Sequence, residues 1–183
     1  CAGDAIPICA VGADCATGFC ENGECTPPPP PAAGDLLISE IMYDPHNGLD
    51  DDNAEYIEVM NVTDGGLDIS GCTVVDAAAN SAPAGLGLET LGAGQVALLV
   101  RSEDPTVNGS LVGNGTFSFA LNNGGDIVTL TCGDAAIDVV DYGAGGYPEA
   151  RAASIMRGAP LVGANPGPDA WCVSTDIYAD GDE

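Results

Sequence analysis

The chain has 183 residues, with 28 acidic side chains, three arginines and no lysine, and its formal net charge at pH 7 is −25. This charge repels phosphate backbones and anionic lipids, which excludes nucleic acid as a ligand and disfavours anionic membrane surfaces. Hydrophobic residues make up 45% of the chain and predict a packed core, while 26 glycines and 13 prolines favour short strands and turns over helices. No apolar run is long enough to span a bilayer.

The first 26 residues contain five of the eight cysteines. Four of these, Cys9, Cys15, Cys20 and Cys25, are evenly spaced. So short a segment cannot build a hydrophobic core, and we therefore predict a disulfide-rich arm in an oxidising compartment. A zinc site is disfavoured because the segment has no histidine and no CxxC pair.

The first residue, Cys1, is open to two interpretations. The chain reads as a mature form, in which Cys1 is either the lipid-carrying cysteine of a bacterial lipoprotein or a residue that ordinary cleavage leaves first. The expected location is extracellular or on the outer cell surface, with lipid anchoring through Cys1 in the first alternative.

Five consecutive prolines, residues 27–31, follow the arm. They favour an extended polyproline II helix of roughly 15 Å, which predicts a stiff spacer. We therefore divide the chain into the arm (1–26), a linker (27–34) and one domain (35–183).

The domain shows short alternating segments separated by turn sequences such as Asn-Gly and Asp-Gly-Gly. Seven or eight short strands without a convincing helix predict an all-β antiparallel sandwich. In chain order the expected strands are 36–43, 55–62, 67–76, 94–101, 116–121, 126–132, 136–142 and 152–157, with a loop over 77–94.

Several blocks in this order carry a family resemblance: LLISEIMYDP, EYIEVMNVTDGGLDISGCTVVD, ALNNGGDIVTLTCGDAAIDVVDYG, ASIMR and the late Trp171. Over about residues 35–175 the chain resembles a bacterial lamin-tail domain. The resemblance implies an immunoglobulin-like β-sandwich without enzymatic activity, of a kind used as a surface or adhesion module on secreted proteins. Cys72 departs from the family, which usually has tryptophan there. The arm is similar to small cysteine-rich modules on secreted proteins of myxobacteria.

Catalysis is not expected. The one histidine, His46, lies in a turn-like segment and is interpreted as an exposed polar residue, and no GxSxG element occurs. Carboxylates are so frequent that proximity of two of them means little; Glu40, Glu55, Glu58, Asp126, Asp138 and Asp141 are the candidates. Glu40, Glu55 and Asn61 match family positions, and we expect them to form structural polar bonds.

Two acidic clusters have the oxygen ligands that calcium prefers. One contains Asp44, Asp50, Asp51 and Asp52, and the other covers residues 176–183. Neither has EF-hand spacing, so the alternative is a solvated acidic loop. No other cofactor is expected.

Cysteine parity links the arm to the domain, because five cysteines lie in the first and three in the second. We expect Cys9 to pair with Cys20 and Cys15 with Cys25, and Cys132 to pair with Cys172. Cys1 and Cys72 then remain and would bond within one chain or between chains. Alternatively, Cys1 carries lipid and Cys72 is a buried thiol.

These features predict a non-catalytic extracellular structural protein that assembles with itself into a fibre or matrix. Two alternatives stay open: a binding module for surface glycans or proteins, calcium-dependent or not, and an ancillary domain of a larger secreted protein.

Overall fold

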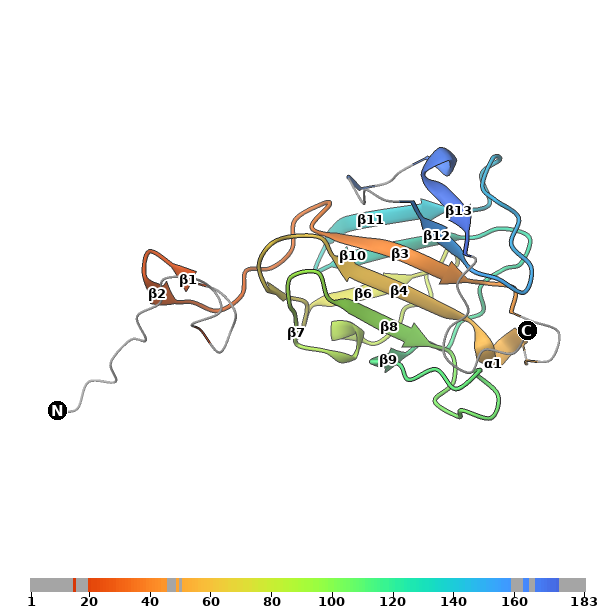
Figure 1. Cartoon of the computed structure of the whole chain (residues 1–183), viewed down its shortest axis with the longest axis horizontal. Helices are drawn as coiled ribbons and strands as arrows, with labels where there is room; N and C mark the ends of the chain where they lie inside the picture. The colour runs from red at the N-terminus through yellow and green to blue at the C-terminus, as the bar shows by residue number, and fades with distance from the viewer. Residues whose placement is uncertain are drawn as a thin grey trace.

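The computed structural model describes residues 15, 20–45, 49, 51–158, 163–164 and 167–174. Two β-sheets pack face to face (Figure 1). The larger sheet has six strands in the order β13-β12-β3-β4-β8-β9: Trp171–Val173, Ile155–Arg157, Leu36–Met42, Tyr56–Asn61, Val96–Val100 and Gly115–Thr116. The smaller has three in the order β11-β10-β6: Ala135–Asp141, Ile127–Cys132 and Cys72–Val75.

Shorter elements complete the described part. A two-stranded sheet joins β5 (Leu67–Asp68) to β7 (Thr90–Leu91), and a hairpin of β1 (Cys20–Glu21) and β2 (Glu24–Cys25) forms in the arm. The helices are the four-residue α1 (Asp51–Ala54) and two 3₁₀ turns, η2 (Ala84–Gly87) and η3 (Pro168–Ala170). Pairing is antiparallel except between β8 and β9. The predicted all-β, immunoglobulin-like sandwich is confirmed. Within the described residues no helix is long and apolar enough to cross a membrane.

The core follows from the alternation of the strands. In β4, Ile57 and Val59 are buried in the core while Glu58 is half-buried on the outer face. On β3, Ile38 and Ile41 both reach the core although they are an odd number of residues apart. The register of β3 against β4 shifts between Ile38 and Glu40, and this irregularity returns the next side chains to the inner face.

Strand β3 also ties the two sheets together. Its amide at Ile38 donates to the carboxylate of Asp138 on β11, and the amide of Gly34, just before the strand, donates to the carbonyl of Ile137. The six-stranded and three-stranded sheets are therefore joined along β3 and β11.

The second half of the proline segment contacts the sandwich. Pro31 is buried, and the carbonyl of Pro29 accepts a hydrogen bond of 2.8 Å from the amide of Asp68 on β5. The division into arm, linker and domain stays a prediction. Because Pro29 and Pro31 contact the sandwich, the part of the proline segment that can act as a free spacer is shorter than five residues. Figure 1 shows the β1–β2 hairpin at the opposite end of the sandwich from α1.

The observed strands differ from the expected ones in two ways. Of the strand predicted at 116–121, only Thr116 lies in a strand, β9 (Gly115–Thr116). Side chains of Glu55 and Arg101 take the place of a neighbouring strand for Phe119 and Leu121. Conversely, β13 and the short β7 were not predicted, since each has too few residues to show alternation.

The disulfides correct part of the predicted pairing. Cys15 is bonded to Cys25, as predicted. Cys132, however, is bonded to Cys72, which stands directly opposite it in the register of β10 and β6. The predicted Cys132–Cys172 bond is therefore wrong, and Cys72 is not left over for Cys1.

The other cysteines complete this account. Cys172 lies exposed on β13 as a free thiol. Cys20 is disulfide-bonded. Cys1 and Cys9 lie outside the described residues.

Candidate functional site

Glu55 and Arg101 hold the segment after β9 against the larger sheet. Glu55 follows α1 and is 1% exposed, and both of its carboxylate oxygens accept from the amide of Leu121, at 3.1 and 3.0 Å. Arg101 follows β8; its Nη1 lies 3.4 Å from Glu55 Oε2 and donates to the carbonyl of Phe119. The guanidinium lies over the Phe117 ring, 5.7 Å from its centroid. This pair fixes backbone, which is a structural role.

Asp138 and Arg157 form a second pair of the same kind. Asp138 Oδ2 accepts from the Ile38 amide at 2.9 Å and from Arg157 Nη2, and both side chains are buried. Arg157 also donates to the carbonyl of Gly163 and lies 5.5 Å from the centre of the Trp171 ring. Two of the three arginines are thus occupied by a buried carboxylate, a carbonyl and an aromatic ring.

Glu40 and Glu58 face each other across β3 and β4 on the outer side of the larger sheet. Glu40 accepts from the Tyr56 hydroxyl at 2.7 Å and from Ser154, while Glu58 accepts from Ser39 at 2.7 Å. Burial raises the pKa of Glu58; the Ser39 hydrogen bond opposes the rise and the charge of Glu40 adds to it. These serine hydroxyls contact carboxylates, and no histidine lies among the described residues to activate them.

Asn61 closes the turn after β4, as expected for a structural polar residue. Its amide nitrogen donates to the carbonyls of Gly65, Leu91 and Gly92, and its oxygen accepts from Thr63. The residue is fully buried and satisfied on both sides. The expected roles of Glu40, Glu55 and Asn61 agree with these contacts.

Asp126 and Asp141 line a hollow at the end of the smaller sheet together with Asp76. Each carboxylate accepts from nearby amides: Asp76 from Ala78 and Asn80, Asp126 from Ala77 and Ile127, and Asp141 from Ala144. Such contacts stabilise loops.

The predicted calcium ligands are only partly in the described chain. Asp44 follows β3, Asp51 and Asp52 begin α1, and Asp50 lies outside the described residues, as does the second cluster over 176–183. No group of three or more candidate metal-binding side chains occurs within the ranges that the structure describes. Calcium binding therefore stays a prediction. His46 also lies outside these ranges.

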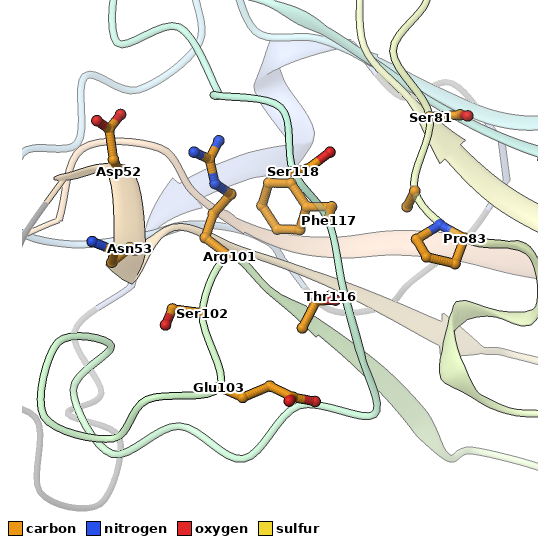
Figure 2. A pocket seen from close by; sticks show the side chains of 11 residues that line it. Asp52, Asn53, Ser81, Pro83, Arg101, Ser102, Glu103, Thr116, Phe117 and Ser118 are labelled. Atoms are coloured by element: carbon orange, nitrogen blue, oxygen red, sulfur yellow. The ribbon is translucent and has the colours of Figure 1, made fainter.

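A hollow with a volume of about 790 Å³ lies beside Arg101 (Figure 2). Figure 2 shows the Arg101 side chain beside the Phe117 ring, with Glu103 on the other side of the hollow. Arg101 Nη1 is held by Glu55 and by the Phe119 carbonyl, so this nitrogen is already occupied within the protein.

Comparison with known proteins gives a family. The model of the Lamin Tail Domain matches residues 29–144, which begins within the proline segment and ends in the loop after β11. Searches of curated proteins and of solved structures returned no match. Lamin tail domains have a non-enzymatic, immunoglobulin-like fold. The two carboxylate–arginine pairs described above, which hold the backbone in place, agree with such a fold. The myxobacterial resemblance of the arm stays a prediction. On the match and the sandwich together, the chain belongs to the lamin tail domain family.

Proposed function

We propose that this chain is a non-catalytic extracellular structural subunit that joins to further copies of itself through disulfide bonds. The observation that carries the proposal is the position of Cys172, which is an exposed free thiol on β13, the edge strand of the larger sheet. An edge strand has one side without a partner strand, so a neighbouring chain can approach it closely.

Two further features support this function. The disulfides Cys15–Cys25 and Cys72–Cys132 indicate an oxidising compartment, where an exposed thiol forms a bond with an accessible partner. The buried carboxylate–arginine pairs are used to hold loops and sheets, which fits a structural domain better than an enzyme.

The partner cysteine follows by elimination within these 183 residues. Cys20 is disulfide-bonded, and the cysteines not otherwise assigned are Cys1, Cys9 and Cys172, of which Cys172 is free. One of Cys1 and Cys9 would therefore pair with Cys20, and the other would be available to Cys172 of a neighbouring chain. A head-to-tail bond of this kind builds an open filament when the rotation from one copy to the next does not close into a dimer or a ring.

Non-reducing electrophoresis and electron microscopy of the native protein test the proposal. We expect a ladder of covalent oligomers that reductant collapses to monomer, and filaments in the images. Cys172→Ser should abolish the ladder, whereas Ser174→Ala, two residues further along the same edge, should leave it intact. A ladder that persists in Cys172→Ser, or a wild-type protein that is monomeric without reductant, would contradict the proposal.

A further inference from the structure

A second hollow, with a volume of about 530 Å³, lies at the end of the sandwich where β3 and β11 finish. Its walls come from the end of β3 (Tyr43 and Asp44), the turn at 123–125 and the loop at 142–151. The first segment lies roughly 80 to 110 residues before the other two in sequence, and it meets them only through the sandwich topology.

Aromatic side chains gather at this hollow. Tyr43 and Tyr142 stack with their ring centres 4.7 Å apart and their planes 13° from parallel. Tyr147 is half-buried, lines the hollow and is supported by Trp171, 6.0 Å away between ring centres. Four of the nine aromatic residues of this aromatic-poor chain therefore lie in or behind one hollow.

Hydrogen bonds hold the walls in place. The Tyr43 hydroxyl accepts from the Ala150 amide at 2.9 Å and donates to the Pro148 carbonyl at 3.5 Å. The Ala152 amide donates to the Asp44 carbonyl at 2.9 Å. A preformed site of this kind spends little binding energy on ordering its loops.

The glycines of the rim are required by a close approach of two backbones. Gly125, with φ at +121°, lies so near Gly143 that a Cβ on Gly125 would be 2.4 Å from the Gly143 Cα. A larger residue at Gly125 would separate the turn from the loop, and a Cβ on Gly143 would already lie 3.3 Å from the Gly125 carbonyl carbon. The shape of the hollow therefore depends on this close approach.

The hollow is lined by both hydrogen-bond acceptors and a hydrogen-bond donor. Asp44 and Glu149 are acceptors, and Arg151 is a donor and the one exposed arginine of the three in the chain. The Tyr142 hydroxyl is buried and has no hydrogen-bond partner in the described structure. Burial raises the Tyr142 pKa; the nearby Asn122 amide opposes that rise without reaching hydrogen-bond geometry.

These observations restrict the class of ligand. An apolar molecule would leave the carboxylates and the guanidinium without partners. A polyanion is repelled by a chain of net charge −25. A neutral sugar has hydroxyls that donate to carboxylates and accept from arginine, and a C–H face that packs on an aromatic ring such as that of Tyr147.

We propose that this hollow binds a neutral sugar residue of an extracellular polysaccharide. Trp171 of β13 supports Tyr147, but Cys172 does not line the hollow. Sugar binding and disulfide assembly therefore succeed or fail independently.

Saturation-transfer NMR on the full chain tests the site, with glucose, galactose, mannose and N-acetylglucosamine as probes and glucuronate as the anionic comparison. We expect transfer to at least one neutral sugar, with little to glucuronate. Tyr147→Ala should weaken binding about tenfold, the loss typical of an aromatic anchor.

Matched variants separate a binding role from a folding role. Glu149 and Glu103 are both exposed, and they line the Tyr147 hollow and the Arg101 hollow respectively. Glu149→Gln should weaken sugar binding several-fold, and Glu103→Gln should not change it. The proposal is overturned if none of the four neutral sugars receives saturation, if Glu149→Gln and Tyr147→Ala bind as wild type does, or if glucuronate binds more tightly than the neutral sugars.

Discussion

Asp138 on β11 and Arg157 on β12 form a buried ion pair that joins the two sheets of the sandwich. The carboxylate also accepts from the Ile38 amide on β3, so three strands meet at one oxygen. Since neither side chain reaches solvent, each charge depends on the other for its compensation.

Replacing Asp138 with alanine should therefore be strongly destabilising. The change leaves the Arg157 charge and the Ile38 amide buried without their partner, and we expect a loss of about 3 to 5 kcal/mol in the free energy of unfolding. Urea denaturation measures it. Asp134→Ala, in the exposed turn before β11, is the control and should change stability little. Equal midpoints for the two variants would show that the pair contributes no stability.

Glu55 should anchor the segment after β9 in a way that amide exchange can detect. Its carboxylate accepts from the Leu121 amide with both oxygens, and no strand replaces it there. In Glu55→Ala we expect exchange at Leu121 to accelerate and stability to fall by about 2 to 3 kcal/mol. Glu103→Ala removes an exposed acid near the same loop and should leave exchange at Leu121 unchanged. Unaltered protection of Leu121 in Glu55→Ala would refute the anchor.

Glu58 should make stability depend on pH with a definite sign. Burial and the Glu40 charge raise the pKa of Glu58 above its ordinary 4.5, so the folded state binds the proton more tightly than the unfolded state. The free energy of unfolding should thus fall as pH rises from 4.5 through the folded pKa.

The variant Glu58→Gln removes this penalty. It should be more stable than wild type at pH 7, by roughly 0.5 to 1 kcal/mol for a partly solvated like-charge pair, and should converge with it below pH 4.5. Thermal unfolding over a pH series measures the difference, and Glu89→Gln, at an exposed position, is the control. A gap that stays constant with pH would contradict the assignment.

The strands were predictable where polar and apolar residues alternate over many positions, so that the apolar side chains all fall on one face. The segment at 36–43 and that at 55–62 each correspond to a strand whose inner residues fill the core. The pairing of Cys132 was not predictable, because it depends on the register of β10 against β6, and parity alone cannot distinguish partners. The sequence favours Cys172 as the partner of Cys132, but Cys172 lies on the other sheet.

The Tyr147 hollow was hidden from the sequence for a related reason. Tyr43 lies about a hundred residues from Tyr142, and only the packing of β3 near β11 brings the two rings into a stack. The chain has nine aromatic residues, and their number alone does not show how the fold distributes them. The one local signal was the glycine-rich run at 143–146 beside two tyrosines.

The Cys72–Cys132 disulfide should be the main covalent contribution to the stability of the sandwich. It closes a loop with a sequence separation of 60 residues, for which loss of the crosslink costs about 4 kcal/mol in the chain-entropy description. Both cysteines should therefore be replaced together, as Cys72→Ala with Cys132→Ala, so that no unpaired thiol is created. Urea denaturation of this double variant should show a loss near that value, whereas Cys172→Ala should unfold as wild type does, because its thiol is free and exposed. The opposite ranking, with Cys172→Ala the less stable protein, would mean that Cys172 and not Cys72 bonds to Cys132.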